Sequence, residues 1–233
     1  MYNMLYMTRN IEFATNEYYH IYNRGTEKRN IFSSKADYER FLALLYFANS
    51  QTPVRMDNIR QMARQQGRTL LEMLVTRDEA DTLVDICVYC LMPNHFHILI
   101  REKEEGNTSK FIQKLSNGYT AYFNKRHERN GVLFQGKYKA THAADDVYLK
   151  YLISYIHLNP IKLIDPQWKE NGITNRKDAK NFLTNYRYSS YLDYLGEKRP
   201  ENHIIHMNAL PEYFENIGDF ESSVTEWLEC KTP

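Results

Sequence analysis

Apolar runs with strand character mark the sheet that this chain is expected to form. Residues 17–23 read EYYHIYN, and residues 84–91 form a mostly apolar run rich in Val, Ile, Cys and Tyr. Residues 92–94 interrupt that run with Pro-Asn turn chemistry, and residues 95–100 return as the second strand of a hairpin. After an Asn-Gly turn signal, residues 132–142 are predicted to be extended.

Apolar positions at helical spacing predict helices between and after these strands. They cover residues 35–47, about 107–127, 145–159 and 214–228, and residues 51–82, rich in Arg and Gln, are interpreted as a helical insertion. The order of elements predicts an α+β fold in which an antiparallel sheet carries helices gathered on one face. This is close to the ferredoxin-like, RRM-like arrangement.

Composition narrows the function classes only slightly. The 233 residues suit one large domain with appendages, and a formal net charge of +1 means that any nucleic-acid surface must come from local clustering. The chain holds 19 tyrosines, so a single tyrosine is a weak candidate for chemistry on its own.

Cysteine usage and apolar run lengths bear on the cellular compartment. Three cysteines make no disulfide framework, and Cys87 and Cys90 lie in a predicted strand where positions three apart face opposite sides, which disfavours a zinc or redox role. No apolar run reaches membrane-spanning length, and the first residues lack a signal-peptide pattern. We therefore expect a cytoplasmic protein without a membrane partner.

Two histidines stand at the start of the returning strand. His95 and His97 flank Phe96, and because strand side chains alternate between faces, both imidazoles point to one side and Phe96 to the other. A pair of neutral imidazoles at this spacing can bind a metal ion. The spacing fits equally well with two polar residues on the open face of a sheet.

A second polar set shares one face of the helix predicted over residues 145–159. Tyr151, Tyr155 and Asn159 are spaced by four residues. An Asn carbonyl oxygen together with two imidazoles makes a partial shell with open positions, which suits Mn²⁺ or Mg²⁺ better than a closed zinc site. On spacing alone, packing against the sheet is the better interpretation of Tyr155.

Four separate motifs follow one another along the chain. They are YHIYNRGTEKRNIF at 19–32, YCLMPNHFHILI at 89–100, NGVLFQGKYKA at 130–140 and YLISYIHLNPIK at 151–162. Together they resemble the single-tyrosine HUH transposases, in particular the REP-associated tyrosine transposases, over roughly residues 17–165 without the insertion.

The resemblance implies a site and a reaction. In that family the nucleophilic tyrosine lies four residues before an Asn or Gln that helps to bind the metal, which matches Tyr155 and Asn159, with His95 and His97 as the other ligands. The implied reaction is cleavage and rejoining of single-stranded DNA near hairpin sequences through a 5′-phosphotyrosine bond, with Mg²⁺ or Mn²⁺ as cofactor. No P-loop is present, in agreement with a reaction that needs no ATP.

Clustered basic residues are the candidate phosphate contacts of this DNA. The basic end of the helix predicted over 107–127 also has a structural explanation, because cations complement the helix dipole there. The candidates are Arg24, Lys28, Arg29, Lys137, Lys139, Lys125 and Arg126.

The resemblance also leaves alternatives open. Residues 1–165 are expected to form the catalytic domain, and residues 166–233 an extension packed on the same domain. A non-catalytic nucleic-acid-binding module on the same sheet and an HUH nickase for replication or transfer are the other functions considered. Monomer and homodimer remain undecided, because some relatives complete each site with the partner's tyrosine.

Overall fold

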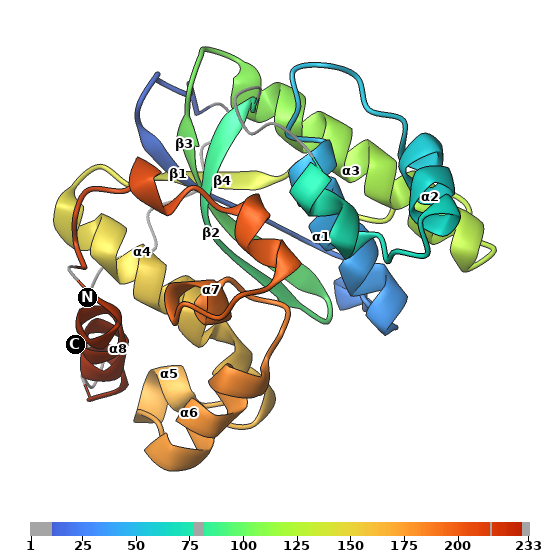
Figure 1. The fold of residues 1–233 in the computed structure, drawn as a ribbon. Helices are drawn as coiled ribbons and strands as arrows, with labels where there is room; N and C mark the ends of the chain where they lie inside the picture. The colour runs from blue at the N-terminus through green and yellow to red at the C-terminus, as the bar shows by residue number, and fades with distance from the viewer. Residues whose placement is uncertain (1–10, 77–81, 215, 230–233) are drawn as a thin grey trace.

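Four strands form one antiparallel sheet, in the order β2-β3-β1-β4 (Figure 1). The computed structural model describes residues 11–76, 82–214 and 216–229. This strand order, with one helix after β1 and another after β3, is that of the ferredoxin-like fold, so the predicted α+β class is confirmed. The strands are β1 (Tyr18–Arg24), β2 (Val84–Met92), β3 (His95–Glu102) and β4 (Lys139–His142).

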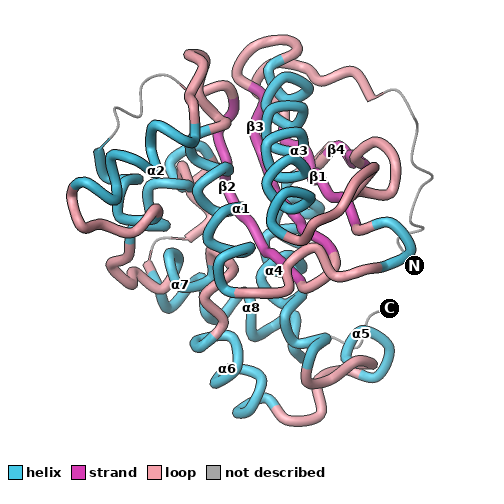
Figure 2. The backbone as a smooth tube through the Cα atoms, turned by 90° about the vertical axis from the view of Figure 1, so that its right-hand side faces the viewer, coloured by secondary structure: helices cyan, strands magenta, loops and turns pink. Residues whose placement is uncertain are grey.

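Helices α1 (Lys35–Phe47) and α3 (Asn107–Arg126) lie side by side on one face of the sheet (Figure 2). Phe96 of β3 points into this layer, where its ring centroid is 5.0 Å from that of Phe41. The larger of two apolar clusters forms here from α1, α3 and the sheet residues that share the side of Phe96. Strand alternation therefore sends the neighbouring histidines to the opposite face.

Helix α4 (Asp146–Leu158) covers that opposite face, where it packs on β2 and β3. Leu152 and Ile156 share a second apolar cluster with Val88 and Leu99. The expectation that helices gather on one face therefore holds for α1 and α3 and is wrong for α4. The reason lies in β2, which is buried along its whole length and so has apolar side chains to cover on both faces.

Two predicted segments differ in extent from the structure. The insertion is helical as expected, with α2 (Met56–Gln65) followed by a 3-10 turn η2 (Leu71–Thr76), and its residues 77–81 lie outside the described residues. The extended segment predicted over 132–142 is a strand only at its end, in β4, because Gly136 adopts a left-handed φ of 71° that turns the chain first.

The region after α4 wraps around its outer side (Figure 1). Trp168, Leu183, Tyr191 and Phe220 from this region belong to the same apolar cluster as α4. None of the described helices is long and apolar enough to cross a membrane. Its elements are η4 (Asn159–Leu163), α5 (Trp168–Asn171), α6 (Arg176–Asn185), α7 (Tyr191–Tyr194), η5 (Pro200–Ile204), η6 (Met207–Ala209) and α8 (Ile217–Glu229).

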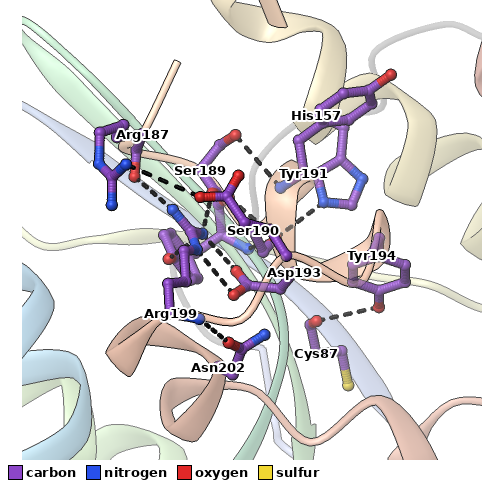
Figure 3. Close-up of polar contacts among 12 residues, drawn as sticks. Cys87, His157, Arg187, Ser189, Ser190, Tyr191, Asp193, Tyr194, Arg199 and Asn202 are labelled. Atoms are coloured by element: carbon purple, nitrogen blue, oxygen red, sulfur yellow. Dashed lines mark hydrogen bonds and ion pairs between the residues drawn. The ribbon is translucent and has the colours of Figure 1, made fainter. Parts of the chain in front are cut away.

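A buried ion pair fastens this region to the edge strand β2 (Figure 3). The Arg199 guanidinium donates to the Asp193 carboxylate, with Nε 2.9 Å from Oδ1, and to the Tyr89 hydroxyl of β2 at 3.0 Å. Ser190 connects the same region to α4, because its Oγ lies 2.8 Å from Nε2 of His157 in that helix. The segment after residue 185 thus ties β2 and α4 together.

Candidate active site

The two histidines of β3 form one wall of the site. His95 and His97 point to the same face, with ring centroids 5.0 Å apart and planes nearly perpendicular. His97 is buried and His95 is half-buried at the hairpin end. Burial, followed by the positive charge of Lys169, lowers the pKa of His95 to about 4. Burial also lowers the pKa of His97 well below its usual value, so both rings are neutral at pH 7 and able to ligate a metal ion.

Helix α4 brings Tyr155 against this wall. The Tyr155 ring centroid is 5.8 Å from that of His97, with an edge-to-face geometry. The two residues are far apart in the sequence, and packing of α4 on β2 and β3 brings them together. Tyr151 lies one turn earlier, 5.6 Å from the Tyr155 ring, and burial raises the pKa of its phenol to about 12.

Asn159 occupies the C-cap of α4 and is buried. Its amide nitrogen donates to the Tyr155 carbonyl at 2.8 Å. That hydrogen bond fixes the side chain to the last turn of the helix and leaves the amide oxygen as the atom suited to a divalent cation. Among the described residues, no three His, Cys, Asp or Glu side chains are arranged to hold a metal ion.

His20 of β1 belongs to the site and is not among the residues that the sequence pointed to. Its Nε2 lies 2.8 Å from Nδ1 of His97, and its ring stacks on that of His97 at 5.0 Å. Burial, with a smaller effect of Lys169, lowers the pKa of His20 to about 3, so it is neutral. His20 lies on a predicted strand and inside the first of the four motifs, but the register that sets it beside His97 is tertiary information.

The hydrogen bonds around the histidines fit a metal on their outer nitrogens. The Asn94 amide donates to the Lys28 carbonyl at 3.2 Å, which orients its oxygen towards Nδ1 of His95 at 2.6 Å. An amide oxygen only accepts, so His95 carries its proton on Nδ1 and its lone pair on Nε2. The same state arises at His97 when His20 accepts through Nε2. Partners of this kind hold metal-binding histidines in the correct tautomer.

Lys169 of α5 also reaches the site, from the region beyond the predicted catalytic domain. Its ammonium donates to the Tyr155 hydroxyl at 2.9 Å and lies 4.1 Å from the centre of the Tyr155 ring. The sequence contained no spacing signal for this residue, because Lys169 lies in the short helix α5, which η4 and a loop separate from α4.

The candidate DNA contacts are distributed over three places. Arg24 ends β1 opposite His95 in the strand register, with Lys28 just after it, and both are exposed. Arg29 is partly used internally, because it pairs with Glu27 at 3.3 Å. Lys139 begins β4, the strand beside β1, and Lys137 precedes it in a turn.

The basic end of α3 lies in the helical layer formed by α1 and α3. Arg126 lies 3.5 Å from the buried carboxylate of Asp37 in α1, so it binds the two helices together. Lys125 is exposed beside it. Four of the candidates therefore lie in or next to the strands β1 and β4, namely Arg24, Lys28, Lys137 and Lys139. Lys125 and Arg126 lie instead in the layer formed by α1 and α3.

The fold and the two-histidine motif define an enzyme of the HUH tyrosine transposase class, whose members generally use a divalent metal ion. The family profile "Transposase IS200 like" matches residues 14–159, more than half of the chain. This chain therefore belongs to the IS200-like transposase family.

Comparison with solved structures identifies a neighbour at low sequence identity. It is the structure of a REP-associated tyrosine transposase bound to a REP hairpin, with 11% identity and a TM-score of 0.48. The match covers 83% of this chain and 87% of the other. No curated relative matches the chain.

Proposed function

We propose that this transposase cleaves and rejoins single-stranded DNA beside hairpin sequences, with Tyr155 as the nucleophile. The observation that carries the proposal is the position of the Tyr155 ring against His97, although β3 and α4 are separate elements. A tyrosine that served only to pack on the sheet would have no need of two neutral histidines beside it. The hairpin preference follows from the motif resemblance to REP-associated transposases.

The reaction is a transesterification at one phosphodiester. The phenol oxygen of Tyr155 bonds to phosphorus while the bond from phosphorus to the 3′-oxygen breaks. The phenol proton passes to solvent, and the departing 3′-oxygen takes up a proton. The product is a 5′-phosphotyrosine with a free 3′-hydroxyl, and attack of that hydroxyl on the phosphotyrosine reverses the step and joins strands.

His95, His97 and Asn159 would hold the divalent metal, for which we propose Mg²⁺ or Mn²⁺ because the donors are mixed nitrogen and oxygen. A bound cation would polarise the scissile phosphate. The protein side of the reaction is to keep both imidazoles neutral by burial and to hold the Asn159 amide on the last turn of α4.

The DNA backbone would follow the exposed cations in and next to the strands β1 and β4. Arg24 lies opposite His95 in the strand register, and Lys139 of the neighbouring strand β4 lies opposite Tyr22 of β1. Phosphate contacts from such residues position a nucleic acid without reading its sequence. We give Arg126 a structural role instead, because of its ion pair with Asp37.

We further propose that one chain is sufficient for catalysis, because both halves of the site come from the same molecule. Two inactive variants, His97→Ala and Tyr155→Phe, would then remain inactive when mixed. Restored cleavage in the mixture would show that the tyrosine acts on a partner's histidines. Sedimentation velocity on the same samples gives the oligomeric state.

Tyr155→Phe tests the nucleophile directly. The full chain is incubated with Mn²⁺ and a single-stranded oligonucleotide that carries an imperfect hairpin from the DNA flanking the gene, and adducts are resolved on denaturing gels. We expect a covalent adduct for the unchanged protein and none for Tyr155→Phe. Tyr151→Phe is the matched control, and it should keep the adduct. An undiminished adduct in Tyr155→Phe would exclude the proposal.

A further inference from the structure

The region after the family match contributes a cation to the site. Lys169 lies ten residues beyond residue 159, where the match to the family profile ends. Its ammonium touches the hydroxyl oxygen of Tyr155, the atom that would attack phosphorus. The extension is therefore in contact with a reacting atom and not merely with the outer side of α4.

Local structure holds Lys169 in this position. The segment 165–174, which contains α5, is closed by Asp165, whose carboxylate accepts from the Thr174 backbone N–H at 3.1 Å. Trp168, the preceding residue, is buried in the apolar cluster around α4. Because its neighbours are anchored, the backbone of Lys169 is already fixed, and less conformational entropy is lost when its side chain is ordered against Tyr155.

The ammonium of Lys169 makes two contacts with Tyr155. Nζ lies over the ring, 4.1 Å from its centre, and it also lies 2.9 Å from the phenol oxygen, within hydrogen-bond distance. A hydrogen bond from a charged donor strengthens as its acceptor becomes negative. The hydroxyl oxygen of Tyr155 gains negative charge when it loses its proton and again when it leaves phosphorus.

We propose that Lys169 is a catalytic residue that holds the Tyr155 oxygen and stabilises its negative charge in both directions of the reaction. In cleavage the phenol oxygen bonds to phosphorus, the bond from phosphorus to the 3′-oxygen breaks, the phenol proton passes to solvent, and the departing 3′-oxygen takes up a proton. In rejoining the 3′-hydroxyl loses its proton to solvent and bonds to phosphorus while the bond from phosphorus to the Tyr155 oxygen breaks. The departing phenolate leaves beside the ammonium and then takes up a proton from solvent. This inference rests on the proposed role of Tyr155.

The first measurement needs no DNA. Protein labelled with ¹³C at the tyrosine Cζ is compared by NMR at one pH, and the Tyr155 signal is assigned from its loss in Tyr155→Phe. We expect Lys169→Met to shift this signal and the exposed-site control Lys198→Met to leave it in place. An unmoved Tyr155 signal in Lys169→Met would show that the hydrogen bond is absent in solution and would overturn the proposal.

The second measurement follows single-turnover cleavage and rejoining of the hairpin oligonucleotide with Mn²⁺. For Lys169→Met we expect both rate constants to fall roughly tenfold, equivalent to about 1.4 kcal/mol, with oligonucleotide affinity unchanged. Lys169→Arg should recover most of the rate because it keeps the charge. Unchanged rates, or a loss confined to DNA affinity, would refute the catalytic role.

The two measurements separate this inference from the function on which it rests. If the unchanged protein forms no adduct, the proposed function fails, and the NMR comparison still decides whether Lys169 holds the Tyr155 oxygen. If the adduct forms normally and Lys169→Met has no effect on either rate, only the inference about Lys169 fails.

Discussion

Replacement of His20 by Phe should weaken metal binding while leaving the fold intact. The ring of His20 stacks on that of His97 at 5.0 Å, and Phe keeps a ring of similar size in that space. What disappears is the ring nitrogen 2.8 Å from Nδ1 of His97, which accepts a hydrogen bond when His97 carries its proton on Nδ1. Without that acceptor His97 is no longer held in this tautomer, and a proton on Nε2 would block the nitrogen that we propose as the metal ligand.

The expected size of this effect follows from the contact that is lost. Removal of a partner behind a metal ligand typically lowers metal affinity about 10- to 100-fold. His97 is buried, so its unpaired Nδ1 also destabilises the fold, by about 1–3 kcal/mol. We therefore expect His20→Phe to bind Mn²⁺ at least tenfold more weakly and to unfold at lower denaturant concentration.

Mn²⁺ titration followed by EPR on the DNA-free protein measures the affinity. Tyr22→Phe is the matched control, since Tyr22 stands on the same strand and stacks with both His20 and His97, and only its hydroxyl is removed. His20→Gln, which retains an acceptor oxygen, should lie between the two. Wild-type Mn²⁺ affinity in a folded His20→Phe protein would refute the reasoning about the His97 tautomer.

Two further predictions concern the framework of the site. Arg199→Met should destabilise the protein by about 3–5 kcal/mol in denaturant unfolding, because it leaves the buried Asp193 carboxylate unpaired, and a combined Arg199→Met, Asp193→Leu variant should regain much of that loss; equal stability of the single variant and the unchanged protein would contradict this. Gly25→Ala should lower the melting temperature and slow adduct formation, because a Cβ at residue 25 would lie 2.3 Å from the Arg29 carbonyl oxygen. The backbone N–H of Gly25 donates to the carbonyl of Asn94, the residue before His95, so a shift of this turn would reach the site. An unchanged melting temperature would show that the turn can shift without cost.

Periodicity and turn chemistry were sufficient to predict most elements. The helix predicted over residues 35–47 is α1 with the same bounds, and the hairpin forms around the Pro-Asn turn. Such signals are local, because one face of a helix or strand and its stop residues lie within a short stretch of chain. The predicted strand over 132–142 is the exception. Its ladder with β1 forms only at Lys139–His142, because the left-handed turn at Gly136 separates that ladder from an isolated bridge between Phe134 and Gly25.

The side of the sheet on which a helix packs is not a local property. The sequence predicted helices on one face, and the position of α4 on the face opposite α1 and α3 follows from burial of β2 on both faces in the folded chain. The same limit applies to charge. The helix dipole already weakened Arg126 as a candidate DNA contact, and the ion pair with the Asp37 carboxylate, 3.5 Å away, gives it a structural role that the sequence did not show.

Some residues of the candidate site could be named from the sequence, and others only from the structure. His95 and His97 share a face because a strand alternates, and Tyr155 and Asn159 share a face because they stand four residues apart, so the motifs alone named these four residues. His20 and Lys169 could be found only in the folded chain. A strand register sets His20 behind His97, and a closed loop brings Lys169 to the Tyr155 oxygen, through contacts that no spacing along the sequence encodes.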